Sequence, residues 1–562
     1  MSWIDWIVLL TALSGIVFYG IWQSRHHHNL DSFFLANKQL PWYHVCLSVM
    51  ATQASAITFL SLPGMAFSDG MRFVQFYFGL PLAMIILCVT FVPVFHKLRV
   101  YTAYEFLENR FDHKTRAFTA LLFLLSRGLA TGISIYAPSI VLSVILQINI
   151  NITTVFIGLL VIIYTAYGGT RAVSYTQLLQ MSVIFSAIIF AGFIVVALLP
   201  QNVGWVRAVE VAGNLGKMNV IDWNFDWNNR YNVWSGIIGG LFLQLSYFGT
   251  DQSQVGRYLT GSSITHSRMG LLMNGLVKIP MQFFILIIGI LVFAFYQFNP
   301  SPVFFNTFET ERLKKSEHAG EFRMLEAKHA HIKAKSNEKA LDLAAAISIR
   351  HEEKTKELRT ELAKLNSEAA EIKTSTTELM KKAHKGADTN DTNYVFLYFV
   401  THHLPVGFIG LIIAVIFLAS MGSLAAGLNS LASSTAVDIY MRSINKSGTD
   451  RTNLVFSRWA TLGWGIFCIL SALYAGKAGN LIEVVNIIGS LFYGTILGIF
   501  IVAFYFKKIK RVFYAAVIAE ILVVLFWYFD VMAFLWLNVA GCLLVIVLGW
   551  GMGVFSGRGE KK

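Results

Sequence analysis

Thirteen long apolar stretches constrain the fold of this chain more than any other feature. They lie near residues 3–22, 44–68, 73–95, 118–147, 152–168, 175–199, 233–255, 271–297, 405–440, 456–475, 481–506, 512–529 and 532–553. A helix of about 20 apolar residues crosses the roughly 30 Å hydrocarbon core of a bilayer. Within lipid, only helices and closed barrels satisfy every backbone polar group. The sequence therefore predicts an all-α membrane protein with about thirteen transmembrane helices.

The formal net charge is +13, although only 14% of the 562 residues are charged. The lysines and arginines lie in short loops between apolar stretches, as the positive-inside rule describes. Arg110 and Lys114 share one such loop, and Arg442 and Arg451 share another. We therefore expect the lipid bilayer, and not nucleic acid, as the partner of the basic residues. The alternation of basic loops predicts a plasma (inner) membrane protein with its amino terminus outside and its carboxyl terminus in the cytoplasm.

Residues 311–386 differ from the rest of the chain. They are rich in Lys, Glu and Ala and contain no proline, which is typical of a solvated helix. A coiled-coil seam with spacings of four and three runs through Leu358, Leu362, Leu365, Ala369, Ile372, Thr376 and Leu379. We expect an external helical or coiled-coil insert, between residues 1–310 with eight spans and 387–562 with five. It is either a tolerated insertion or a docking site for a partner protein.

Two spans carry small and hydroxyl residues where polar groups are costly. In the second span, Pro63-Gly64 interrupts regular helical bonding, and a loosened helix would expose carbonyls to a small hard cation. In the ninth span, Ser420 and Ser423 are three residues apart and share a face. Together they predict an all-oxygen sodium cage, although close helix packing by small residues explains both stretches equally well.

Three stretches together resemble the sodium:solute symporter family, which includes sialic acid, iodide and monocarboxylate carriers. Residues 51–64 are similar to the first core helix, 167–180 to the loop that opens the fifth, and 249–258 to the end of the sixth. The resemblance implies a LeuT-type core of two inverted five-helix repeats, with one span before it and two after. It implies a sodium-coupled symporter that imports a small organic solute by alternating access, and not an enzyme.

The resemblance also implies which residues bind sodium and the solute. Sodium would be held by carbonyls of Ala51, Ala54 and Ala419 and by the hydroxyl of Ser423, with Ser420 compensating for Gly422, where the family has a hydroxyl residue. The solute cavity would be lined by Gln53, Ser55, Thr58, Phe73, Gln75, Arg127, Gln244, Tyr247, Phe248, Lys278 and Asn486. Arg127 and Lys278 either extend to the membrane surface or face the cavity. The second case favours an organic anion or a sugar-like solute.

The chain departs from the family at Gln177, where an aspartate usually serves the sodium route or a second sodium site. A neutral amide supplies no charge, so we expect a single coupling sodium ion. One alternative is a symporter that uses a proton. Another is a transporter-like sensor or partner-recruiting membrane protein, which the few residues after the last span disfavour because they are too short for a signalling domain.

Overall fold

The computed structural model describes residues 1–562 except 25–38, 99–101, 446–448, 476–478, 510–511 and 558–562. At residues 17, 20–24, 167–175, 450 and 553–557 only the backbone is described, so the side chains of the motif at 167–175 lie outside the description. The described residues are helical apart from connecting segments and one isolated bridge between Leu40 and Gly261. The prediction of an all-helical protein is confirmed.

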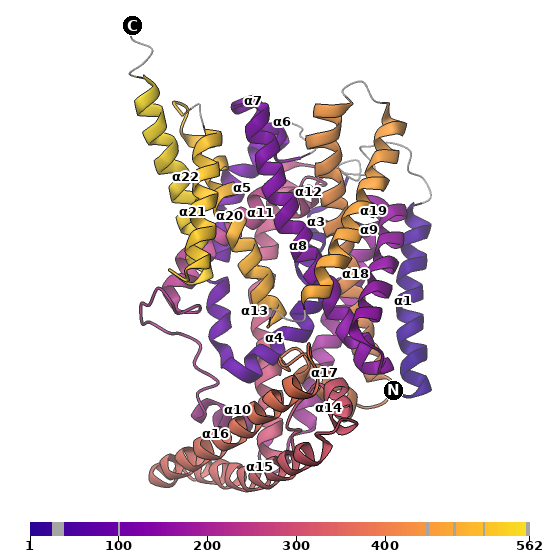
Figure 1. Ribbon diagram of the computed structural model, residues 1–562, viewed down its shortest axis with the longest axis vertical. Coiled ribbons are helices and arrows are strands. Elements are labelled where there is room, and N and C mark those ends of the chain that lie inside the picture. Colours follow the sequence, from indigo (N-terminus) through magenta and orange to yellow (C-terminus); the bar gives the residue numbers. More distant parts are fainter. Residues whose placement is uncertain (25–38, 99–101, 446–448, 476–478, 510–511, 558–562) are drawn as a thin grey trace.

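Most of the helices form a bundle that runs between two ends of the molecule (Figure 1). The elements are α1 (Trp3–Ser24), α3 (Trp42–Gln53), α4 (Ala56–Asp69), η2 (Gly70–Tyr77), α5 (Leu80–Val89), α6 (Phe91–Leu98), α7 (Glu105–Arg110), α8 (His113–Leu146), α9 (Ile150–Ala197), α10 (Gly204–Asn214), η3 (Ser235–Gly239), α11 (Gly240–Thr250), α12 (Gln252–Tyr258), α13 (Ile264–Phe298), α14 (Thr307–Lys314), α15 (Ala319–Ser348), α16 (Glu352–Ala383), α17 (Val395–His403), α18 (Phe408–Ser434), η4 (Thr435–Ile444), α19 (Asp450–Ala475), α20 (Leu481–Tyr505), α21 (Val512–Tyr528) and α22 (Phe534–Gly557). Among these, η2 is a 3₁₀ helix, and η3 and η4 are π-helices.

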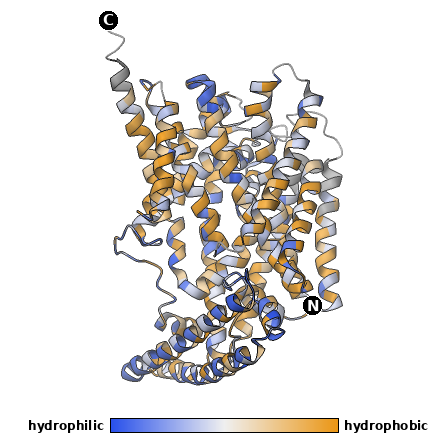
Figure 2. Ribbon diagram, viewed as in Figure 1, coloured by the Kyte–Doolittle hydropathy of each residue, from blue (hydrophilic) through white to orange (hydrophobic). Residues whose placement is uncertain are grey.

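The outer surface of the bundle is apolar. Within the described residues, eight helical segments are long and apolar enough to cross a membrane, and three further apolar helices are shorter. Ile163, Phe193, Leu276 and Val547 expose 62–69% of their surface, which is favourable only in contact with lipid. Figure 2 shows hydrophobic residues along the bundle and hydrophilic ones concentrated in α15 and α16. The chain is a multi-pass membrane protein.

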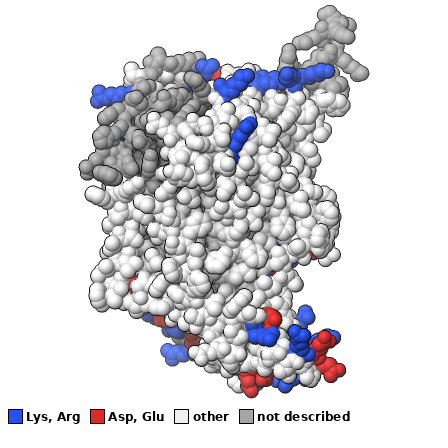
Figure 3. Space-filling model, turned by 180° about the vertical axis from the view of Figure 1, so that it is seen from behind, with Lys and Arg blue, Asp and Glu red and all other residues white. Residues whose placement is uncertain are grey.

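Charged side chains gather at the two ends of the molecule. On the face shown in Figure 3, Lys and Arg line the end opposite α15 and α16, whereas those two helices carry both signs. The wide band between the two ends is nearly free of visible charge. This distribution matches a protein whose middle lies in hydrocarbon, because isolated charges there are costly.

A single helix, α9, covers the predicted span 152–168 and nearly all of the predicted span 175–199. Its two halves are not collinear. At 1.5 Å per residue, Tyr164 and Thr176 would lie about 18 Å apart along a straight helix. Instead, the Tyr164 hydroxyl lies 3.2 Å from Thr176 Oγ1. The helix is therefore not straight between these residues. Its two apolar parts are Ile150–Ala166 and Thr176–Ala197.

The second predicted span is interrupted, but not at Pro63-Gly64, so that expectation was wrong. The interruption lies at Ala54 and Ser55, between α3 and α4. Pro63 and Gly64 are inside α4 and serve packing: a Cβ at Gly64 would overlap the Thr392 carbonyl, and one at Gly289 of α13 would overlap the Pro63 carbonyl. A proline inside a transmembrane helix is tolerated because neighbouring elements compensate for the missing bond.

Helices α15 and α16 form an antiparallel hairpin. Figure 1 shows it at the end of the bundle where α1 begins, whereas α22 ends at the opposite end. Five of the predicted seam residues are buried, namely Leu358, Leu362, Ala369, Thr376 and Leu379, and Leu365 and Ile372 are partly buried. They face a buried seam on α15 that includes Phe322, Ala340 and Leu343. The seam therefore holds the two helices of the hairpin together.

We expect Leu362→Ala to loosen the hairpin without disturbing the bundle. Leu362 is fully buried, and truncation of a buried leucine to alanine typically costs about 2–5 kcal/mol. Hydrogen exchange on the full-length protein should show faster exchange in α15 and α16 and unchanged exchange in α18 and α20. The matched control is Lys364→Ala, because Lys364 is exposed on the same helix. Equal exchange in the two variants would show that the seam does not stabilise the hairpin.

Candidate functional site

A cavity of about 100 Å³ lies beside the interruption between α3 and α4, with walls from α8, α11, α13, α18 and α20. Eight of the predicted site residues line it: Gln53, Ser55, Thr58, Arg127, Tyr247, Lys278, Ser423 and Asn486. Ala51, Ala54 and Ala419 are buried on elements that also contribute side chains to the wall. Most of the polar residues singled out in the sequence thus converge on one cavity within the bundle.

The interruption leaves backbone oxygens beside this cavity. Ala54 leaves the helical conformation (ψ 79°), and the Ser55 amide donates to the Gln53 carbonyl rather than to Ala51, four residues back. Carbonyls in the last turn of a helix need partners from outside the helix. Ser423 of α18 lines the same cavity, and its hydroxyl donates a 3.1 Å hydrogen bond to the Ser420 carbonyl. Hard cations such as sodium bind oxygen ligands of this kind.

Gln177 of α9 connects α3, which ends at the interruption, to α18. Its Oε1 accepts a 2.6 Å hydrogen bond from Ser48 Oγ, and its Nε2 donates to Thr52 Oγ1 (3.3 Å) and to the Gly422 carbonyl (3.2 Å). A Cβ at Gly422 would lie 2.5 Å from Gln180 Oε1 and 3.5 Å from Gln177 Cγ. The two departures from the family pattern, at Gln177 and Gly422, are therefore physically linked, because the missing side chain makes room for the amides.

The two basic residues predicted at the cavity differ in their partners. Arg127 forms an ion pair with Asp251, donates to the Tyr493 hydroxyl (3.3 Å) and lies 5.4 Å from the Tyr247 ring centroid. Lys278 is 1% exposed and has no acidic partner among the described residues. Its Nζ lies 6.0 Å from the centroid of the Tyr77 ring. Neither side chain extends to the membrane surface, and only the charge of Lys278 is uncompensated.

Five predicted residues do not reach the cavity. Phe73 stacks on Phe76 with ring centroids 5.3 Å apart, and Gln75 binds the Tyr231 carbonyl (3.1 Å) and the Asp222 amide (3.0 Å). Phe76 and Tyr77 line the cavity in their place. The remaining three are Gln244 and Phe248, which are buried outside it, and Ser420, which lines a separate apolar hollow beside α1. The 3₁₀ geometry of η2, with three residues per turn, explains why its facing residues were misassigned.

Asp251 and Tyr493 belong to this site although the sequence did not predict them there. Asp251 lies between α11 and α12, and its Oδ2 accepts a 2.8 Å hydrogen bond from the Tyr493 hydroxyl. Asp251 is part of the 249–258 motif. A carboxylate in an apolar segment requires a partner within the bundle, which could have pointed to Arg127.

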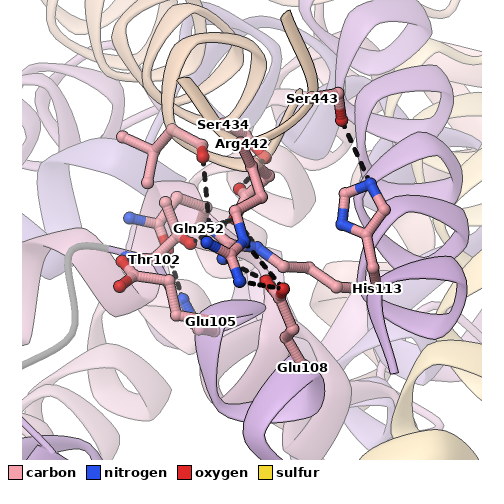
Figure 4. A network of polar contacts seen from close by, with 12 residues as sticks. Thr102, Glu105, Glu108, His113, Gln252, Ser434, Arg442 and Ser443 are labelled. Carbon is pink, nitrogen blue, oxygen red and sulfur yellow. Dashed lines mark hydrogen bonds and ion pairs between the residues drawn. The ribbon is translucent and has the colours of Figure 1, made fainter. Parts of the chain in front are cut away.

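A second polar network lies nearer the end of the bundle that is opposite the hairpin (Figure 4). Asp438 of η4 is fully buried and accepts hydrogen bonds from Thr102 Oγ1 (2.7 Å), Ser434 Oγ (2.6 Å) and Arg116 Nε (2.9 Å). Glu108 accepts from both Arg116 (2.8 Å) and Arg442 (2.7 Å). The network joins α7 and the start of α8 to η4. It holds this end of the bundle together.

Comparisons with known proteins agree with this architecture. The model of the sodium:solute symporter family matches residues 33–313 and 372–519, which is more than half of the chain. It leaves out residues 314–371, which contain α15 and part of α16.

Individual relatives match over different lengths. The sodium/sialic acid symporter SiaT of Proteus mirabilis is 24% identical over 98% of this chain and 94% of its own length. The human sodium/iodide cotransporter is 32% identical, but over 51% of this chain and 44% of its own length.

The fold has a solved counterpart. The substrate-bound, outward-open structure of a Na⁺-coupled sialic acid symporter superposes with a TM-score of 0.75 at 22% identity, over 99% of this chain and 98% of that one. The fold is therefore LeuT-like, as the resemblance implied. Together with the family match, these findings identify a sodium-coupled transporter rather than an enzyme, and this chain belongs to the sodium:solute symporter family.

Proposed function

We propose that this protein imports a small organic anion with a single negative charge, together with sodium, by alternating access. The observation that carries the proposal is the charge of the cavity. Arg127 and Asp251 neutralise each other, whereas Lys278 has no acidic partner among the described residues and is buried in the wall. A buried ammonium is unfavourable until it is paired, and a solute carboxylate would supply a strong, charge-assisted hydrogen bond.

The other polar groups in the wall suit the neutral part of such a solute. Gln53, Ser55, Thr58 and Asn486 line the cavity, and the Gln53 Oε1 has no hydrogen-bond partner among the described residues. A neutral sugar would satisfy these groups but would leave Lys278 unpaired. The names of the two relatives support an anion, because iodide and sialic acid both carry a single negative charge at neutral pH.

For the coupling ion, we propose carbonyls of Ala51, Ala54 and Ala419 and the hydroxyl of Ser423 as ligands. Ser420 is omitted because it does not line this cavity but a separate hollow. Gln177 already joins α3, α9 and α18 through hydrogen bonds and supplies no negative charge, which supports one sodium ion per cycle. A proton is a poorer candidate, because no Asp or Glu is among the described residues that line the cavity.

The distribution of charge supports an orientation. Basic side chains gather at the end opposite the hairpin (Figure 3), and the positive-inside rule assigns that end to the cytoplasm. We propose thirteen spans, an external amino terminus, a cytoplasmic carboxyl terminus and an external insert over residues 311–386. The insert is then available to a protein partner outside the cell or is a tolerated insertion.

The variant Lys278→Gln tests whether the solute is an anion that pairs with Lys278. A hydrogen bond to a charged group contributes about 1.5–3 kcal/mol, so affinity for the best monoanion should fall about 10- to 100-fold. The measurement is a thermal-shift screen of the purified protein in sodium against monocarboxylates and neutral sugars. Lys278→Arg should retain part of the affinity, and Lys364→Gln on the hairpin should change nothing. Stabilisation by a neutral sugar that is unchanged in Lys278→Gln would refute the proposed anion.

Two serines on one helix test the sodium ligands. We expect Ser423→Ala to raise the sodium concentration for half-maximal solute-dependent stabilisation about tenfold, since one ligand oxygen is lost. Ser420→Ala is the matched control and should leave this concentration unchanged, because Ser420 does not line the cavity. The ligand assignment is wrong if the two variants weaken sodium dependence equally.

The neutral amide at Gln177 leads us to expect one sodium ion transported per solute molecule. Paired isotope fluxes in proteoliposomes should give one sodium ion per solute molecule, and the sodium dependence of uptake should have a Hill coefficient near one, because one cation site remains. Two sodium ions per solute would contradict the assignment of Gln177.

A further inference from the structure

We propose that Asp251 determines the charge selectivity of the cavity by holding Arg127 in its wall, so that Arg127 does not bind the solute. This inference rests on the proposed function, because it concerns an anionic solute in the same cavity. Asp251 acts through Arg127 and is therefore a positioning residue. The sequence alone leaves two other roles open for Arg127, as a direct ligand of a carboxylate or as a side chain that extends to the membrane surface.

Arg127 is fixed on three sides. Its Nε donates to Asp251 Oδ2 (3.1 Å), and its Nη2 contacts the same oxygen and the Tyr493 hydroxyl (3.3 Å). The guanidinium also lies over the Tyr247 ring, an arrangement that stabilises a cation. Only 11% of the side chain is exposed. Three elements, α8, α11 and α20, thus hold the guanidinium in one place.

Asp251 is fixed as firmly as its partner. Its Oδ1 accepts hydrogen bonds from the Ser253 amide (2.8 Å) and the Ser253 hydroxyl (2.6 Å), which caps the start of α12. Its Oδ2 accepts from Arg127 and from the Tyr493 hydroxyl. The carboxylate is completely buried. Because both oxygens are committed to α8, α12 and α20, Asp251 cannot leave the pair to accommodate a ligand.

A solute carboxylate would therefore have to compete with Asp251 for Arg127. Removal of one partner from a buried ion pair is strongly unfavourable, because the other charge is left uncompensated. Lys278 has no such competitor among the described residues. The wall around the cavity then presents one available positive charge, which matches a monoanion and disfavours a second carboxylate on the solute.

The pair also lies at a particular end of the cavity. Helix α8 begins in the network of Arg116 and Glu108, and its cavity-lining residues are Arg127, Ala130, Thr131 and Ser134. Arg127 is thus the lining residue of α8 nearest that network. Arg127 therefore lines the cavity on the side away from the hairpin, and Asp251 is its buried partner outside the lining.

Three variants test the assignment: Asp251→Asn, Arg127→Gln and the double variant R127Q/D251N. The probes are matched monoanions and dianions, namely butyrate with succinate, lactate with malate and gluconate with glucarate, measured in sodium by thermal shift and calorimetry. The wild type should prefer the monoanion of at least one pair by about tenfold or more. If no monoanion stabilises the wild type, the proposed function fails before the inference is tested.

Asp251→Asn should free the charge of Arg127 and shift the ratio of dianion to monoanion affinity about tenfold or more towards the dianion. A purely structural role for Asp251 would weaken both probes and leave this ratio unchanged, which would overturn the proposal.

The double variant removes both charges, keeps the net charge of the wall and replaces the ion pair by two amides, which proteins often tolerate. It should keep the monoanion affinity of the wild type within about threefold. A tenfold loss in the folded double variant would show that Arg127 binds the solute and would overturn the inference. If Asp251→Asn fails to fold, the double variant alone decides. Arg127→Gln, which lowers the wall charge by one, should weaken monoanions more than the double variant does.

Discussion

The interruption of the helix at Ala54 and Ser55 is the constraint on which the site depends. In lipid, an unpaired backbone carbonyl has no water to bind, so irregular backbone persists only where protein groups or a cavity surround it. Here the Ser55 amide binds Gln53 instead of Ala51, and Thr52 and Ser48 bind the Gln177 amide. A cation between the freed oxygens and Ser423 would complete this arrangement. The polar residues of α3, α9 and α18 form their hydrogen bonds beside this break in the helix.

Several buried charges in the bundle are also paired. The buried acidic groups Asp251 and Asp438 are each held by an arginine and by hydroxyl groups. Each cluster joins elements that are distant in the sequence: Arg127–Asp251 joins α8 to the α11–α12 junction, and the Asp438 network joins α7 and α8 to η4. Lys278 is the exception in the cavity wall. A solute of opposite charge can pair with an uncompensated charge in a cavity wall. Because Asp251 neutralises Arg127, Lys278 is the cation that would pair with such a solute.

Several residues show which parts of the site could be predicted from the sequence. Gln53, Ser55, Thr58, Lys278 and Ser423, predicted from the family resemblance or from their polar side chains within apolar segments, all line one cavity. Phe73 and Gln75 were placed wrongly at it, because η2 has the three-residue turn of a 3₁₀ helix. The break was expected at Pro63-Gly64, but those residues are used for close contacts with Thr392 and α13. Ser420 and Ser423 share a face by their spacing of three, yet the two residues line different hollows.

The sequence by itself determined that this chain is a bundle of membrane helices with a polar insert, because hydrophobic length and the placement of charge are properties of the chain alone. Its motifs determined the family. Only the tertiary structure decided that Arg127 is neutralised and Lys278 is not, since the partner of Arg127 lies 124 residues away and comes from another helix. The net charge of a cavity depends on which ionised groups meet in space, and packing of the helices, not their order, brings them together.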